Sequence, residues 1–70
     1  MEKIEIRTEF IKLDSFLKYA AVCGSGGEAK VIVEDGQVTV NGELCTMRGR
    51  KLRPGDEISV GGKSFQVTGK

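Results

Sequence analysis

The chain has 70 residues, of which 39% are apolar, enough for one small domain with a single core. No apolar run is long enough to span a bilayer, and the charged start MEKIEIRTEF is unlike a secretory signal, so we expect a soluble, cytoplasmic protein. Two cysteines without any histidine cannot supply a four-ligand zinc site, so we expect free, buried or half-buried thiols, no metal and no cofactor. The sequence also lacks the commonest general base near neutral pH, and no enzymatic activity is expected.

The net charge of +1 conceals an asymmetry between two parts of the chain. Residues 1–44 carry five cations and eight anions, whereas residues 45–70 carry six cations and two anions. Four cations fall within six positions: Arg48, Arg50, Lys51 and Arg53. Because like charges repel, this cluster has a free-energy cost unless an anion offsets it, and it favours an anionic polymer as the partner. A solvated, charged loop without a ligand is the alternative.

The first predicted elements are a strand and a helix. Residues 3–7, KIEIR, alternate isoleucine with charged residues, which predicts a half-buried strand. We expect the helix that follows to end between Ala21 and Gly24. Its apolar residues have the i, i+3, i+4, i+7 spacing of an amphipathic helix: Leu13, Phe16, Leu17 and Ala20.

A second short helix is predicted after the glycine-rich stretch CGSGGEAK. Ser25 and Glu28 form a Ser-x-x-Glu capping box, in which each side chain accepts a hydrogen bond from the other residue's amide. Asp35 and Gly36 are expected to end this helix. The glycine spacing matches neither a Walker A loop nor a dinucleotide fingerprint, which disfavours a nucleotide site. The glycines either form a tight turn between two helices or let an anion approach the amides at the helix start.

Four strands are predicted in the rest of the chain. QVTV alternates valine with polar residues and precedes Asn41-Gly42, a strong hairpin signal, with the second strand running through residues 44–46. EISV and KSFQVTG form another hairpin across two glycines. Between the hairpins, RGRKLRPGDE is predicted to be a basic loop in which Pro54-Gly55 form a type II turn. The expected order is strand, helix, helix and four strands.

The few aromatic residues narrow the choice of anionic partner. The chain has three phenylalanines, one tyrosine and no tryptophan, and Phe16 falls on the predicted core face of the first helix. A platform on which single-stranded bases stack is therefore not indicated. Recognition of a structured RNA through its backbone and shape fits these residues better.

Residues 12–60 resemble the RNA-binding domain family named after ribosomal small-subunit protein S-four. The matching pieces, in chain order, are LDSFL at 13–17, Ser25 at a helix start, Ala29 within that helix, GQVTVNG at 36–42 and PGD at 54–56. The resemblance implies an α+β fold with two short helices packed on a small, bent antiparallel sheet, the αL RNA-binding motif. It also implies that residues 1–70 form a single domain, similar to the stand-alone bacterial members of the YaaA/YbcJ-like group.

The resemblance and the charge pattern together predict the residues that contact RNA. Many family members carry arginine directly after the helix-opening serine, whereas this chain has Gly26, which shifts the weight to backbone amides, Lys30 and the basic loop. The expected partner is a structured RNA, either ribosomal RNA or a ribosome assembly intermediate, bound by a monomer without a membrane or a small-molecule substrate. The candidate RNA-binding residues are Lys12, Ser25, Gly26, Gly27, Lys30, Arg48, Arg50, Lys51 and Arg53.

Two other functions stay open. A VNGE hairpin is also common in ubiquitin-like sulfur carriers, but these need a C-terminal Gly-Gly, and this sequence ends in Thr68-Gly69-Lys70. A small protein-binding adaptor that uses an edge of the sheet is the other alternative.

Overall fold

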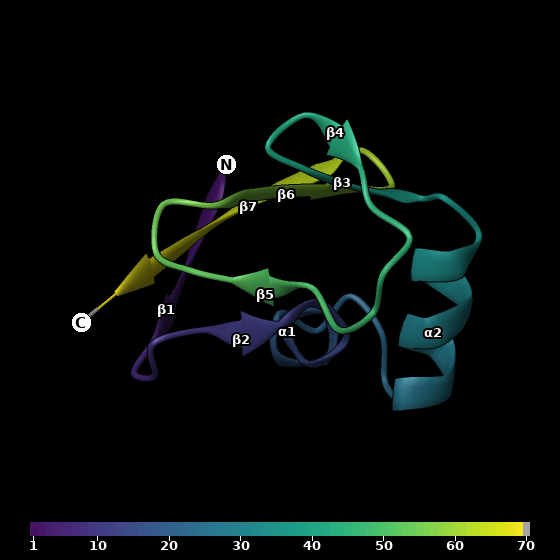
Figure 1. Ribbon diagram of the computed structural model, residues 1–70, viewed down its shortest axis with the longest axis horizontal. Helices are drawn as coiled ribbons and strands as arrows, with labels where there is room; N and C mark the ends of the chain where they lie inside the picture. Colours follow the sequence, from purple (N-terminus) through teal and green to yellow (C-terminus); the bar gives the residue numbers. More distant parts are fainter. Residues whose placement is uncertain (70) are drawn as a thin grey trace.

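The computed structural model describes residues 1–69 and contains two helices and seven strands (Figure 1). The helices are α1 (Leu13–Tyr19) and α2 (Gly26–Glu34). The strands are β1 (Glu2–Ile6), β2 (Ile11–Lys12), β3 (Val38–Val40), β4 (Glu43–Leu44), β5 (Lys51–Leu52), β6 (Glu57–Val60) and β7 (Lys63–Gly69). Within residues 1–69, neither helix has the length and apolar character that a membrane crossing requires.

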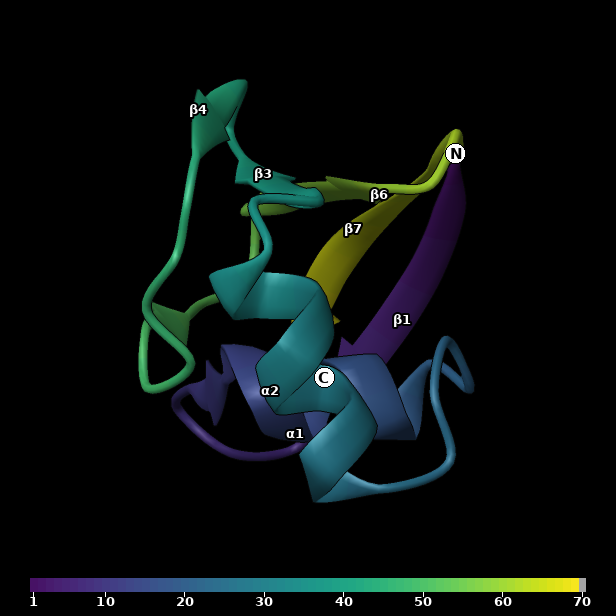
Figure 2. The same ribbon diagram turned by 90° about the vertical axis from the view of Figure 1, so that its right-hand side faces the viewer.

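The helices lie on one side of the main sheet, and the core lies between the two layers (Figures 1 and 2). Helix α1 presents Leu13, Phe16 and Leu17 to this core, as its apolar spacing predicts, and all three are fully buried. The ring of Phe16 meets that of Phe65 on β7 edge to face, with centroids 5.9 Å apart. Helix α2 adds Ala29 and Val33, and the sheet supplies alternate residues of β3, β6 and β7.

The main sheet has the strand order β1-β7-β6-β3-β4. The β3–β4 and β6–β7 hairpins form at the predicted turns, each across a two-residue loop whose residues have positive φ. In the first loop these are Asn41 at 52° and Gly42 at 84°. Strand β4 ends at Leu44, before the predicted end at residue 46. The α+β fold is confirmed, with one difference in detail: β1 pairs with β7 in parallel, so the sheet is mixed.

Two short strands were not predicted from the sequence. Strand β2 pairs antiparallel with β5 in a separate ladder, with Ile11 opposite Leu52 and Lys12 opposite Lys51. The sequence analysis treated residues 51–52 as part of a loop. A strand of two residues carries no period of its own, and these partners lie about forty positions apart in the chain.

Both helices end in the same hydrogen-bond pattern, a Schellman motif. After α2, the amides of Gly36 and Gln37 donate to the carbonyls of Val33 and Ile32, and Gly36 has φ +78°, as predicted for its position. After α1, Ala21 takes the left-handed position with φ +60°. Helix α1 therefore stops at Tyr19, earlier than the predicted range. The sequence does not signal this end, because an alanine occupies the position where glycine usually marks it.

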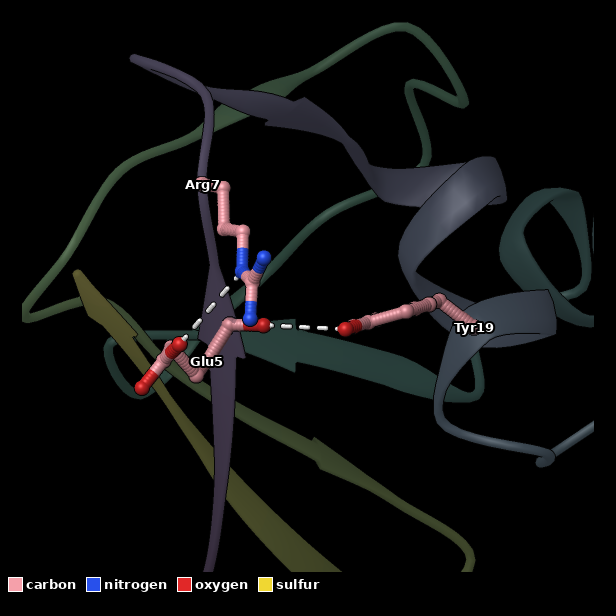
Figure 3. A network of polar contacts seen from close by, with 3 residues as sticks. All are labelled: Glu5, Arg7 and Tyr19. Atoms are coloured by element: carbon pink, nitrogen blue, oxygen red, sulfur yellow. Dashed lines mark hydrogen bonds and ion pairs between the residues drawn. The ribbon is translucent and has the colours of Figure 1, made fainter. Parts of the chain in front are cut away.

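A side-chain contact ties α1 to the outer strand β1 (Figure 3). The Tyr19 hydroxyl donates a hydrogen bond of 3.1 Å to the main-chain carbonyl of Glu5. The Glu5 carboxylate lies 3.9 Å from Nε of Arg7, the residue that directly follows this strand. The tyrosine thus satisfies a carbonyl on an otherwise open sheet edge and holds the end of α1 against it.

Candidate nucleic-acid interface

The basic segment, residues 48–53, is fixed at its first end by hydrogen bonds to the start of α1. The amide of Leu13 donates to the carbonyl of Arg50 at 2.8 Å, and the amide of Asp14 donates to the carbonyl of Arg48 at 3.1 Å. Helix α1 has no side-chain cap of its own, since its N-cap residue is Lys12. The main chain of the basic segment therefore supplies the cap that this helix lacks.

The middle of the basic segment is anchored in the core. Leu52 on β5 is fully buried, whereas Lys51 beside it is exposed. Successive residues of a strand point to opposite faces, so the burial of Leu52 fixes the direction of Lys51 toward solvent.

The far end of the basic segment is held by two interlocked turns. The carboxylate of Asp56 accepts from the amide of Arg53 at 2.8 Å and from the side-chain amide of Asn41 at 3.0 Å. The side chain of Asn41 in turn accepts from the amide of Glu57 at 2.9 Å. The amide of Asp56 donates to the carbonyl of Arg53, and Gly55 has φ +102°, as the predicted type II turn requires. The Asn41-Gly42 and Pro54-Gly55 turns are thereby joined.

The cations of the basic segment differ in their surroundings. Arg48 lies 3.6 Å from the carboxylate of Glu34, at the C-terminal end of α2. The ammonium of Lys51 lies 4.8 Å from the centre of the Phe10 ring, a cation–π contact. Arg50 is half-buried and Arg53 is exposed. Lys12 lies directly opposite Lys51 in the β2–β5 ladder, so it adds to this cationic surface.

A second group of candidate residues lies at the start of α2. Ser25 has extended backbone angles, and its hydroxyl accepts from the amide of Glu28 at 3.2 Å, so the Ser25 half of the capping box forms as predicted. Among residues 1–69 the return bond from the Glu28 carboxylate to the Ser25 amide is absent. Within the same residues, the amides of Gly26 and Gly27 have no protein acceptor.

The sequence analysis missed one cation at this second group. A Cβ atom added to Gly26 would lie 4.0 Å from Nζ of Lys18, which places the Lys18 ammonium beside the start of α2. Lys18 is exposed and belongs to the last turn of α1. The position of Lys18 in the apolar pattern places it on the polar face of α1, but no sequence pattern predicts that this face lies beside α2.

The candidate residues thus form two groups rather than one. The basic segment meets α2 at Glu34, and the glycine turn opens the same helix at Gly26. Eight residues of helix separate these ends, about 12 Å at 1.5 Å per residue. Lys30 is exposed on the helix between them. Residues 1–69 enclose no pocket, so all the candidates lie on open surface.

The two cysteines take no part in this surface. Cys23 and Cys45 are both free and buried, as predicted. Each thiol lies near a main-chain carbonyl, that of Ser25 for Cys23 and that of Met47 for Cys45. Their surroundings are those of small core residues.

Comparison with known proteins gives relatives that match most of the chain. It is 49% identical over 65 residues to the probable ribosome maturation protein RlbA of Bacillus subtilis, covering 91% of this chain and 92% of that protein. It is 35% identical over 57 residues to the putative RNA-binding protein YbcJ of Escherichia coli, covering 81% of each. A third relative, small ribosomal subunit protein uS4 of Novosphingobium aromaticivorans, is 32% identical, and the chain spans only 28% of its length.

Solved structures of related proteins share the fold of this chain. The solution structure of YbcJ from E. coli, described with an αL motif involved in RNA binding, superposes with a TM-score of 0.75 at 30% identity and covers 97% of this chain. The 30S ribosomal protein S4e of Thermoplasma acidophilum shares the fold, with a TM-score of 0.72 at 23% identity. The family model described as the S4 domain matches residues 4–68. The chain therefore belongs to the S4 domain family, and its resemblance to the stand-alone members of that family is confirmed.

Proposed function

We propose that this protein is a non-catalytic RNA-binding module that recognises structured RNA, either ribosomal RNA or a ribosome assembly intermediate. The observation that carries the proposal is the basic segment, in which clustered cations project from a backbone held at both ends and in the middle. Rigid placement matters because each flexible side chain that is ordered on binding costs conformational entropy. A fixed backbone leaves only the side chains themselves to be ordered.

The chemistry of the surface fits phosphate better than bases. Arginine can bind two phosphate oxygens at once through its planar fork, and three of the four cations in the basic segment are arginines. The three phenylalanines are poorly placed for stacking: Phe16 and Phe65 are buried, and the Phe10 ring lies under Lys51. Tyr19 is exposed, but it is a single ring, and its hydroxyl is bound to the carbonyl of Glu5. Contacts to the backbone of a folded RNA are the mode that these residues support.

The start of α2 is the second part of the proposed surface. The amides of Gly26 and Gly27, together with the nearby Lys18 ammonium, would receive a phosphate close to the main chain, where glycine leaves room. Lys30 on α2 would contact the RNA between the two groups. Arg48 would exchange its ion pair with Glu34 for a phosphate.

The relatives support the ribosomal part of the proposal. RlbA is named as a probable ribosome maturation protein, uS4 as a ribosomal subunit protein and YbcJ as a putative RNA-binding protein. A ribosomal partner would place this protein in the cytoplasm. We propose that the monomer is the form that binds RNA.

Crosslinking in living bacteria tests the function. The tagged protein is crosslinked with ultraviolet light, and the bound RNA is sequenced alongside the proteins recovered with it. The parent is compared with the variant Arg50→Ala/Arg53→Ala, which lacks two cations but keeps the main chain of the basic segment in place. We expect reads concentrated on ribosomal RNA for the parent and fewer for the variant. Protein partners without RNA above background would instead favour an adaptor.

A further inference from the structure

The β2–β5 ladder places two lysines in an arrangement that the fold alone does not favour. Lys12 and Lys51 are direct partners in an antiparallel pair, and both are exposed. Side chains at such positions lie on the same face, with Cβ atoms about 4.5–5.5 Å apart. Like charges directly opposite each other destabilise a strand pair.

The ladder fixes the main chain of the two lysines opposite each other. The other pair of the ladder is Ile11 and Leu52, and Leu52 is fully buried, so a shift by one residue would bring a lysine into the core. The hydrogen bond from the amide of Leu13 to the carbonyl of Arg50 continues the pairing on one side. The cation–π contact with Phe10 further fixes the ammonium of Lys51.

No acidic side chain in the described part of the chain forms an ion pair with Lys12 or Lys51. The ion pairs within residues 1–69 join Arg7 to Glu5 and Arg48 to Glu34, and neither involves Lys12 or Lys51. Arg48 therefore has a paired carboxylate, whereas the two opposed lysines have none among residues 1–69. Among the cations around the basic segment, an external anion would therefore stabilise this pair the most.

We propose that Lys12 and Lys51 form one joint site for a single backbone phosphate of RNA, with the phosphate lying between the two ammonium groups. This inference rests on the proposed RNA-binding function and adds which cations act as a unit. It separates the pair from Arg50 and Arg53, which would contact phosphates individually. The pair would lower the stability of the free protein and recover that loss when RNA binds.

Salt titration with fragmented ribosomal RNA counts the phosphates at this site. Each phosphate contact contributes about 0.7–0.9 to the slope of log K against log salt. We expect the Lys12→Gln/Lys51→Gln double variant to lose about 0.7–0.9 in slope, because one phosphate is lost. Lys63→Gln, an exposed lysine opposite Val60 on another hairpin, is the control and should keep the slope of the parent.

Melting of the RNA-free protein tests the repulsion separately. Lys12→Glu should raise the melting temperature by about 2–6 °C, because it turns a like-charge pair into an ion pair. In a Lys51→Glu background the same change should raise it less or lower it, because two carboxylates then face each other. Any favourable effect of Glu at the start of α1 is common to both backgrounds and cancels in the comparison.

The outcomes separate this inference from the function on which it rests. If the parent binds RNA and the double variant loses no slope, or loses about twice the value of one contact, the joint site is wrong and the proposed function stands. An equal effect of Lys12→Glu in both backgrounds would likewise remove the joint site. A parent protein that does not bind the RNA fragments would overturn both proposals.

Discussion

The two helices of this protein begin in opposite ways. Helix α2 is capped locally, by the hydroxyl of Ser25 three residues before the amide it accepts from. Helix α1 is capped from a distance, by the carbonyls of Arg48 and Arg50, which lie more than thirty positions away in the chain. Both solutions satisfy amides at a helix start, but they leave different groups available to a ligand.

In the proposed mode of binding, one short segment serves both the fold and the function. In the basic segment the main chain is used by the fold, because its carbonyls cap α1, and the charged side chains stay at the surface. At the start of α2 the reverse holds: a side chain makes the cap, and the amides of Gly26 and Gly27 have no acceptor within residues 1–69. Cationic side chains at one place and main-chain amides at the other are complementary ways to receive phosphate.

The largest change in stability is expected at Leu52, which anchors the segment whose carbonyls cap α1. Leu52→Ala removes a fully buried side chain from the basic segment and should lower the free energy of unfolding by about 2–5 kcal/mol. Urea unfolding followed by circular dichroism measures this. Val31→Ala on α2, where the side chain is largely exposed, is the control and should change stability by less than about 0.5 kcal/mol. A loss for Leu52→Ala no greater than that of the control would mean that the basic segment is not anchored in the core.

The local cap is expected to contribute less. Ser25→Ala removes the hydroxyl that accepts from the amide of Glu28 and should lower the free energy of unfolding by about 1 kcal/mol. Ser15→Ala, in the exposed first turn of α1, is a matched change without a capping role. Equal stability of the two variants in urea would contradict the assignment of Ser25 as the cap.

The ends of the helices give a smaller effect of opposite sign. Ala21 occupies the left-handed position after α1, which an L residue adopts at a cost that glycine avoids. Ala21→Gly should therefore raise the free energy of unfolding by about 0.5–1 kcal/mol, even though glycine is more flexible in the unfolded chain. Gly36→Ala, the converse change after α2, should lower it. Thermal melts of both variants measure these changes. A destabilised Ala21→Gly protein would contradict the cost assigned to alanine at this position.

The ion pair between Arg48 and Glu34 provides the smallest predicted effect. In the proposed mode Glu34 competes with RNA for Arg48, so Glu34→Gln should strengthen binding to ribosomal RNA fragments about 2–4-fold. Glu43→Gln on β4 changes the net charge equally and removes no ion pair within residues 1–69. Fluorescence anisotropy measures both. Equal gains for the two variants would show only a general charge effect.

Much of the fold could be predicted from sequence patterns that act over a few residues. The start and end of α2 follow from Ser25 and Gly36, whose side-chain chemistry and backbone freedom act within a few residues. The two hairpins follow from Asn41-Gly42 and Gly61-Gly62 in the same way. The family pattern placed these elements together, and the buried residues of α1 and β3 followed from their spacing. The burial of Leu52 did not follow, because its strand falls within a predicted loop.

Contacts between distant residues could not be predicted from these signals. The β2–β5 ladder and the distant cap of α1 depend on segments more than thirty positions apart, and neither leaves a periodic pattern. The early end of α1 was missed because Ala21 replaces the usual glycine. Lys18 was missed, and Arg48 was predicted without its acidic partner, because the packing of α2 on its neighbours decides both contacts.

We infer that the side chains of the basic segment contact RNA phosphates while its main chain maintains the fold. The most direct test is a salt titration of the parent and of Arg50→Ala/Arg53→Ala against ribosomal RNA fragments. The variant keeps the carbonyl that caps α1, so it should stay folded, and it should lose two phosphate contacts, about 1.4–1.8 in slope. Lys3→Ala/Lys63→Ala, two exposed lysines on β1 and β7, should keep the parent's slope. An unchanged slope in a folded Arg50→Ala/Arg53→Ala variant would show that these two side chains do not contact RNA phosphates.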